Sequence, residues 1–237
     1  MRSILLSLIM GLFLFNTAIA QKEEKETIEG NGNLVTRTIP VHSFDALKAS
    51  GIYELKLTQG NTEGVKIEAD ENLQDLFTVR NDGTKLIIDM KKLEGKNLKT
   101  KNKMRVYVTF RKLKSMELNM VGNVSAEDAL SFDDVELNNS SVGHVNLKLN
   151  ANKINLENKS VGNLTLSGKA QNAVLRNNGV GSINAGNFVV QTMDIDNSGI
   201  GSAEVNAEKE LKVKDSFLGK VKNKGAAPVR KVNRVVI

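Results

Sequence analysis

The residues best placed for chemistry in this sequence are carboxylates, since the chain has no cysteine and only two histidines. Asp194 and Asp196 flank Ile195, and residues two apart on a strand project from the same face. Enzymes that cleave polysaccharides use paired carboxylates as general acid and base. The repeat described below places Arg176 and Lys214 beside this pair, and adjacent cations hold a carboxylate ionised. The pattern therefore favours a solvent-exposed ladder of opposite charges over a catalytic pair.

The two histidines, His42 and His144, do not indicate a metal site. Zinc needs three or four histidine, cysteine or carboxylate ligands, and neither histidine has such neighbours at ligand spacing. The sequence also has no serine in a nucleophile-elbow pattern and no glycine-rich phosphate loop. We therefore predict no catalytic residues, no metal site and no cofactor.

The most distinctive charged segment is basic. It runs from Lys91 to Lys114 and contains ten lysine or arginine residues, opposed within the segment only by Glu94. A surface of this kind attracts lipopolysaccharide phosphates and acidic glycans, whereas lysines in a loop also keep edge strands from aggregating. Both interpretations stay open. The candidate residues for an anionic ligand are Lys96, Lys99, Lys101, Lys103 and Arg105.

The N-terminus has the three parts of a secretory signal peptide. Arg2 supplies positive charge, residues 4–15 form an apolar run too short to span a membrane, and Ala18-Ile19-Ala20 forms a cleavage site. We predict a signal peptide over residues 1–20, with a retained membrane anchor as the alternative, and a polar tether over 21–29. The mature chain is then expected to lack a transmembrane segment and to reside in the periplasm, at the cell surface or outside the cell. Export also argues against nucleic acid as a partner, although the net charge is +6.

Residues 116–221 repeat with a period near 20. Six pairs of an aliphatic residue and a glycine recur, with glycines 21, 19, 19, 20 and 18 residues apart. A fixed period of this length is typical of a solenoid, in which each repeat forms one coil. The repeated glycines are Gly122, Gly143, Gly162, Gly181, Gly201 and Gly219.

Aligning the repeats on these glycines predicts where the core lies. Positions −8 and −6 before the glycine and +2 and +4 after it are apolar in nearly every repeat, and the positions between them are polar. This alternation predicts two half-buried strands per coil, joined by a corner at the glycine. The aliphatic residue directly before the glycine is also expected to enter the core. No segment within the period is long enough for a helix, which excludes a leucine-rich repeat.

Position −4 is asparagine in four consecutive repeats. A surface asparagine has no reason to recur in register, so we expect the amides to point inward and to hydrogen-bond along the stack. An exposed turn is the alternative. The corner glycine is then required either for a positive φ or because a Cβ has no room. The predicted ladder consists of Asn139, Asn158, Asn177 and Asn197.

These patterns predict an all-β fold, namely a single-stranded right-handed parallel β-helix with about 20 residues per coil. The β-helix domain is expected over residues 30–227, with irregular coils over 30–113 and regular coils over 114–227. The first half holds both tyrosines and several phenylalanines, so it is expected to form an aromatic-containing β cap over one open end. Residues 228–237 are expected to be a tail or a cap strand.

Parts of the sequence resemble the family described as "putative auto-transporter adhesin, head GIN domain". The similarity covers roughly residues 30–225. The resemblance implies a secreted β-helical domain of the bacterial cell envelope, and it brings no catalytic residues with it. The segments that carry it are Asn33–Ile39, Phe44-Asp45 and Ser50–Gly60 at the opening, and Gly179–Ile183 and Ser198–Ser202 in the repeats.

We therefore predict a secreted structural or adhesive binding module of the cell envelope, and not an enzyme. Its expected partners are anionic polysaccharide or other envelope polymers, contacted through the basic surface. One alternative is a carbohydrate-active β-helix enzyme, which would need outward acidic residues clustered in one groove on adjacent coils. The other is an accessory envelope protein without a ligand. The sequence determines neither the ligand nor the oligomeric state.

Overall fold

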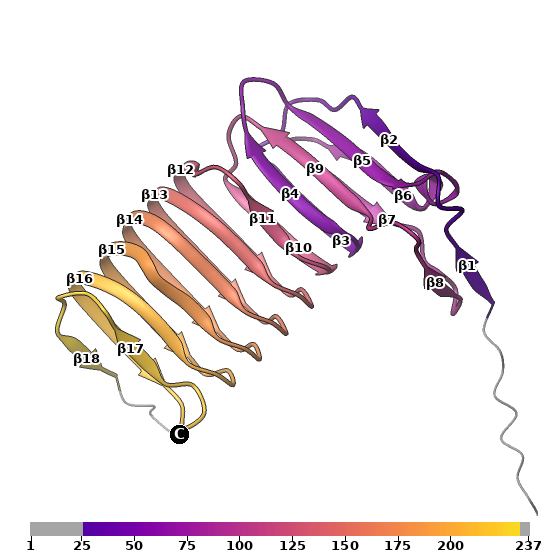
Figure 1. The fold of residues 1–237 in the computed structure, drawn as a ribbon. Helices are drawn as coiled ribbons and strands as arrows, with labels where there is room; N and C mark the ends of the chain where they lie inside the picture. The colour runs from indigo at the N-terminus through magenta and orange to yellow at the C-terminus, as the bar shows by residue number, and fades with distance from the viewer. Residues whose placement is uncertain (1–25, 233–237) are drawn as a thin grey trace, which may run out of the picture.

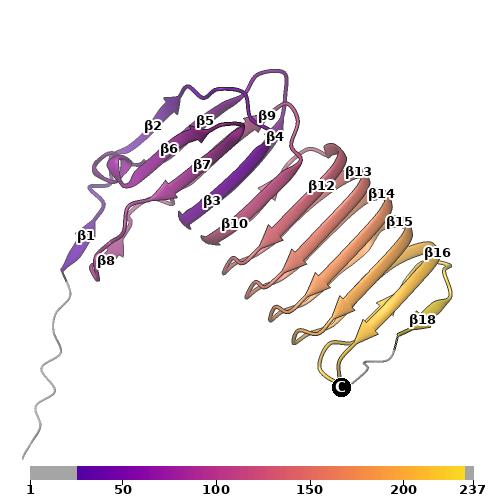
Figure 2. The ribbon, with the colours of Figure 1, turned by 180° about the vertical axis from the view of Figure 1, so that it is seen from behind.

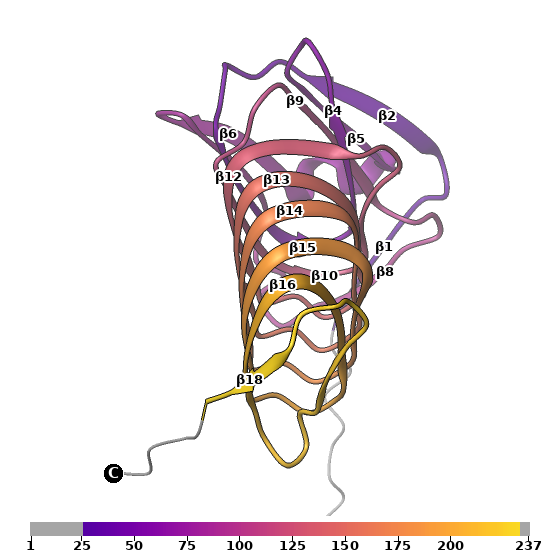
Figure 3. The same ribbon diagram turned by 90° about the vertical axis from the view of Figure 1, so that its left-hand side faces the viewer.

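A row of parallel coils forms the body of the protein, and the computed structural model describes it over residues 26–232 (Figure 1). The predicted signal peptide lies outside the described residues, as do residues 21–25 of the predicted tether and residues 233–237. Seen from the C-terminal end, the chain winds as a right-handed solenoid (Figure 3). The predicted fold class is therefore confirmed.

Long bent strands build the regular coils. Each of the longest strands leaves one glycine corner, bends, and runs to the next corner, so it serves two successive coils. We call the segments that run towards the corner the first face and those that leave it the second face. The strands are β10 (Ser115–Val121), β11 (Val124–Ala126), β12 (Leu130–Asn139), β13 (Val145–Asn158), β14 (Leu164–Asn177), β15 (Ile183–Asn197), β16 (Ala203–Asp215), β17 (Val221–Asn223) and β18 (Val229–Lys231).

Stacking in register buries the apolar columns. On the first face Leu156 lies beside Leu175, which lies beside Ile195, and all three are buried. The same holds on the second face for Val145, Leu164 and their successors. Four apolar positions per coil were predicted to form the core, and their burial confirms this, because a continuous core forms only when like residues stack.

The N-terminal half differs from the predicted irregular coils, because its order in space is not its order in sequence (Figure 2). The coil made by β3 and β4 lies between the coil of β7 and β9 and the coil of β10 and β11. The bounds of its elements are β1 (Thr27–Glu29), β2 (Leu34–Ile39), β3 (Ala46–Ile52), β4 (Glu54–Gln59), β5 (Gly64–Asp70), the 3-10 helix η1 (Glu71–Leu76), β6 (Phe77–Asp82), β7 (Lys85–Met90), β8 (Asn97–Lys99) and β9 (Arg105–Phe110).

Antiparallel strands cover the N-terminal end of the solenoid. β5 pairs with β9, β2 pairs with β5, and β6 pairs with β7 through the turn after Asp82. Aromatic side chains pack beneath them, with the rings of Tyr53 and Phe77 5.7 Å apart between centroids and Phe110 fully buried. This is the aromatic-containing cap that the sequence predicts. Antiparallel pairing ends the stack because it interrupts the parallel register that a further coil would need.

Both ends of the described chain are tied down by short strands. β1 pairs in parallel with β8, so Thr27–Glu29 belong to a strand although the tether was predicted to extend to residue 29. At the other end β18 pairs with β16 and follows the first face of the last coil.

The four ladder asparagines are buried in the corners. Asn139 Nδ2 donates to Asn158 Oδ1 over 2.8 Å, Asn158 Nδ2 to Asn177 Oδ1 over 2.8 Å, and Asn177 Nδ2 to Asn197 Oδ1 over 2.6 Å. Asn197 Nδ2 ends the ladder by donating to the backbone carbonyl oxygens of Gly201 in its own corner and Lys220 in the next one. The amides therefore tie each coil to the next inside the core, where water is excluded.

Both predicted reasons for glycine at the corners, a positive φ and the lack of room for a Cβ, are found in the structure. Gly162 has a φ of +137°, and a Cβ on it would lie 2.0 Å from the carbonyl oxygen of Gly143 in the coil before. Gly219, the last of the six, is not at positive φ, but a Cβ there would lie 2.3 Å from the carbonyl oxygen of Asn197. A side chain is excluded because successive backbones approach so closely.

The aliphatic residues before the corner glycines lie on the surface, so the prediction that they enter the core is wrong. Val121, Val142, Val161, Val180 and Ile200 are 46–53% exposed. Each bridges in parallel to its counterpart in the neighbouring coil, and Ile52 continues the row at one end. The residue before each of the five is buried, as Met120, Ser141 and Ser160 are, so the alternation along the chain points the next side chain outward. The column is apolar because its members cover one another. We call this row the corner stripe.

We expect Asn177→Ala to destabilise the protein by about 2–4 kcal/mol, because Asn158 Nδ2 and Asn197 Oδ1 then lose their partners inside the core. Thermal and urea unfolding of the variant and the wild type would measure this. The matched control is Asn178→Ala, one residue further on and exposed, where a change within about 0.5 kcal/mol is expected. Equal losses at the two positions would contradict the ladder's role.

The inward and outward sides of β15 predict different costs of substitution at two adjacent residues. Ile195 is fully buried, so Ile195→Asp should cost about 4 kcal/mol or more by placing a carboxylate in the core. Asp194 is half-exposed and ion-paired, so Asp194→Asn should cost about 1 kcal/mol or less. Urea unfolding of the two variants measures both values. Similar costs would refute the assignment of Ile195 to the core and Asp194 to the surface.

Candidate binding surfaces

The carboxylate pair on β15 lies within a ladder of ion pairs. Asp194 Oδ1 is 2.8 Å from Arg176 Nη1, and Asp196 Oδ2 is 2.8 Å from Lys214 Nζ. Burial alone would raise the pKa of Asp196, but hydrogen bonds from Lys214 and Ser198 outweigh it and hold that pKa below its ordinary value. A general acid needs a raised pKa, so Asp196 does not have the electrostatics of the general acid of a glycosidase.

A second group of carboxylates lines a cleft of about 520 Å³ beside β12. Asp133, Asp134 and Glu136 all belong to that one strand. The adjoining segments contribute Lys112, Lys114 and Lys153 to the same cleft. Lysines thus lie among the carboxylates of this cleft. Within residues 26–232, no three histidine, aspartate or glutamate side chains are grouped so that they could hold a metal ion.

His144 is an exposed member of a corner ladder. The backbone N–H of His144 donates to Asn123 Oδ1 over 3.0 Å, and the backbone N–H of Asn163 donates to His144 Nδ1 over 3.3 Å. Ser182 repeats the pattern by donating its N–H to Asn163 Oδ1. His144 therefore takes the place of an asparagine in a structural ladder.

The tertiary structure brings acidic partners to the basic segment. Lys96 Nζ lies 2.9 Å from Glu26, Lys99 Nζ lies 3.2 Å from Glu29, and Lys103 Nζ lies 3.2 Å from Glu54. Arg105 lies between Glu54 and Glu68. Of the five candidate residues, four are therefore ion-paired, and only Lys101 has no ion pair among the described residues. The sequence shows only Glu94 as an opposing charge because the other acids lie far away along the chain.

Four exposed lysines of the segment have no ion pair within residues 26–232. They lie on the connection between β7 and β9 and on the turn after β9, at the capped end of the solenoid. Exposed ion pairs are worth little, so these lysines and their paired neighbours both contribute to the field at this surface. We call these four the free lysines: Lys91, Lys92, Lys101 and Lys112.

Buried Asp70 holds this connection in place. Its carboxylate accepts hydrogen bonds from the backbone N–H of Lys101 over 3.0 Å and from the backbone and side chain of Asn102. Burial alone would raise the pKa of Asp70, but these hydrogen bonds outweigh it and lower that pKa. Asp70 lies at the end of β5, so it fixes Lys101 relative to the cap.

A family model covers most of the chain. The family described as "putative auto-transporter adhesin, head GIN domain" matches residues 43–227. This chain belongs to that family. The resemblance seen in the sequence is therefore confirmed, and membership of an adhesin family supports a location at the cell envelope or surface. No curated protein matches the chain.

Solved structures share the fold of this head GIN member. A putative adhesin from Bacteroides fragilis has a TM-score of 0.74 and 26% identity, covering 86% of this chain and all of that one. A putative lipid binding protein from Parabacteroides distasonis has a TM-score of 0.61 and 18% identity, covering 88% of this chain and all of that one. A putative adhesin from the same species has a TM-score of 0.57 and 20% identity, with 87% and 100% covered. Over residues 26–232, no helix has the length and apolarity to cross a membrane.

Two surface features of this head GIN member are missing from the sequence prediction. The corner stripe was assigned to the core, although an inward asparagine at position −4 makes position −2 inward as well and so indicates an outward side chain at position −1. A trough across β12–β15 was not predicted, because the bend between the two faces has no constant spacing.

We expect Asp70→Asn to lower the melting temperature at neutral pH. We also expect the melting temperature of the variant to fall less than that of the wild type as the pH is lowered. Because the pKa of Asp70 is lowered by folding, its contribution is present above the ordinary carboxyl pKa of 3.8 and is lost as the pH falls through the folded value. Melting curves of both proteins between about pH 7 and pH 3 would show this. A variant that loses as much stability as the wild type over this range would contradict it.

Proposed function

We propose that this protein is an exported binding module of the bacterial cell envelope that holds an anionic polymer against its capped end. The free lysines carry the proposal. Lys91, Lys92 and Lys101 lie on the connection between β7 and β9, where Asp70 fixes Lys101, and Lys112 adds its charge at the other end of β9. The ligand chemistry is a run of phosphates or carboxylates, as in lipopolysaccharide or an acidic glycan. Such charges attract lysines over long distances and in many orientations.

Several observations support this proposal over the others. The family and two of the neighbours above are described as adhesins, which bind external components. One neighbour is described as a lipid binding protein, and the phosphorylated headgroup of a lipid presents the same anionic chemistry. The enzyme alternative lacks support, since the carboxylates of β15 are ion-paired and those of β12 lie among lysines.

The proposal predicts salt-sensitive binding that depends on the free lysines. Residues 21–237 should bind immobilised lipopolysaccharide or heparin in about 0.05 M NaCl and release it in about 0.5 M NaCl, because salt screens exposed charges. Changing the free lysines to glutamine should weaken binding at least about tenfold. Each exposed ion pair between a lysine and an anionic group of the ligand contributes up to about 1 kcal/mol. Surface plasmon resonance would measure both effects.

A matched control changes four lysines on other coils, Lys148, Lys159, Lys209 and Lys220, to glutamine and so removes the same net charge. It should weaken binding by about threefold or less, because those lysines are dispersed. Equal losses in the two variants would show that net charge alone is responsible, and the proposed surface would be wrong.

A further inference from the structure

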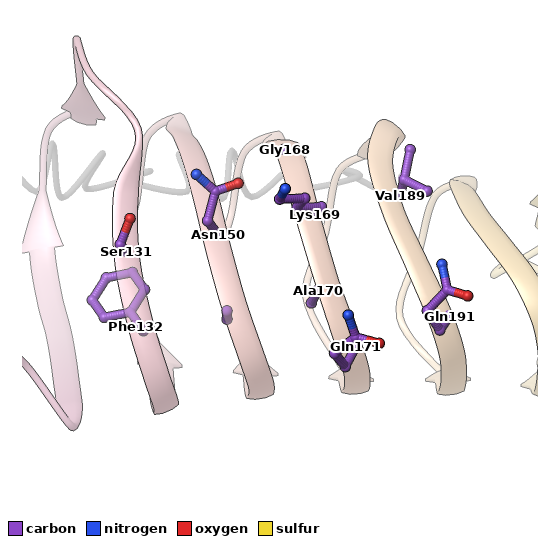
Figure 4. A pocket seen from close by; sticks show the side chains of 10 residues that line it. Ser131, Phe132, Asn150, Gly168, Lys169, Ala170, Gln171, Val189 and Gln191 are labelled. Atoms are coloured by element: carbon purple, nitrogen blue, oxygen red, sulfur yellow. The ribbon is translucent and has the colours of Figure 1, made fainter.

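A shallow trough of about 640 Å³ crosses the four strands β12–β15 at the bend between the second and first faces (Figure 4). Its lining residues form three rows parallel to the solenoid axis. Ser131, Asn150 and Lys169 are in register in the first row, followed by Val189. The middle row begins with Phe132 and continues with alanines, and Gln171 and Gln191 lie on the opposite side. Three strand spacings make the trough about 14 Å long.

The hollow arises from small residues on the two central strands. Ala151 and Ala170 are in register in the floor, between the ring of Phe132 and the larger residues of β15. Gly168 has a φ of +103°, and a Cβ on it would lie 2.1 Å from the carbonyl oxygen of Leu149. This glycine is outside the corner columns, so it serves the local shape and not the repeat.

The polar side chains of the trough have no partners within the described residues. The amides of Asn150, Gln171 and Gln191 and the ammonium of Lys169 make no side-chain hydrogen bond or ion pair there. Residues just outside the trough are engaged with one another: Thr192 Oγ1 donates to Asn172 Oδ1 over 2.6 Å. Three amides and one cation are thus available to a ligand above an apolar floor.

The repeat is also irregular at this place. The register between β14 and β15 shifts between Thr165 and Ser167, and that between β15 and β16 shifts twice between Asn184 and Thr192. Bulges interrupt a regular stack at some cost to its ladder and are frequent beside functional sites. The irregular segments flank the trough on the β15 side.

We propose that this trough binds an extended, uncharged oligosaccharide with its chain along the solenoid axis. A pyranose ring presents an apolar face of C–H groups, which fits the floor of alanine, glycine and phenylalanine. Its hydroxyls both donate and accept hydrogen bonds, and a side-chain amide does the same. Sites with a mainly apolar lining and a few convergent polar groups are typical of small-ligand binding. The length across four coils matches a chain of several sugars better than a single one.

Other ligand classes fit the trough less well. An extended peptide would need free backbone groups at a strand edge, but β13 and β14 are paired on both sides. An anionic polymer would meet only one cation, Lys169, in the lining. A lipid chain needs a deep apolar pocket, whereas amides border this shallow floor on both sides.

The site is independent of the basic surface proposed above, and the two differ in their response to salt. Binding to the free lysines depends on ionic strength, whereas neutral hydrogen bonds and apolar contact in the trough do not. Loss of one therefore leaves the other intact, and either proposal can fail alone.

The test uses isothermal titration calorimetry of residues 21–237 with hexasaccharides of glucose, xylose, mannose and N-acetylglucosamine, and with the matching monosaccharides. At least one hexasaccharide should bind, more tightly than its monosaccharide and equally in about 0.1 and 1 M NaCl. Gln171→Ala with Gln191→Ala should weaken it about tenfold, the loss expected for two neutral hydrogen bonds. Ala151→Leu keeps every polar group but fills the floor, and it should weaken binding to a similar extent.

The matched control is Asn146→Ala with Asn184→Ala, which removes two exposed amides of β13 and β15 outside the trough. This control should bind like the wild type, and melting curves should show all variants folded. The proposal is overturned if no hexasaccharide binds at about 10 mM. It is also overturned if binding survives both trough variants, if the control loses as much, or if binding disappears at high salt.

Discussion

Coil-to-coil hydrogen bonding at the corners is the constraint on which the rest of this structure depends. Each coil must turn sharply at the same place, and the buried amides of Asn139 to Asn197 make that place identical from coil to coil. A buried amide without a partner is costly, so the ladder favours one register over all others. The glycines next to it allow the backbones to approach closely enough for that ladder to form.

Once the register is set, every outward-facing column of the repeat becomes a row on the surface. Rows of opposite charge pair, as Arg176, Asp194, Asp196 and Lys214 do. The corner stripe is a row of the same kind, because its aliphatic side chains cover one another. Regular rows of this sort stabilise the stack and offer little that is specific to a ligand. Binding is therefore expected where the rows are interrupted.

Two interruptions distinguish this chain from an ideal solenoid. At the capped end, the connection between β7 and β9 carries exposed lysines and is held by Asp70. Along the side, small residues and bulges open a trough across β12–β15. The first surface attracts charge and the second offers amides above an apolar floor. The two surfaces therefore suit ligands of different chemistry, the first an anionic polymer and the second an uncharged oligosaccharide.

The sequence by itself determined the coil period, the buried columns and the inward asparagines. Each position of the repeat occurs up to six times, so its preferred residue type is evident even where one coil departs from it. Only the tertiary structure decided the rest. The outward direction of Val121 and its counterparts depends on how the chain passes the corner, where the residue before each of them is buried. The pairing of Lys96, Lys99 and Lys103 depends on strands that are distant in sequence. The insertion of β3–β4 between later coils follows from long-range pairing, which no local pattern records.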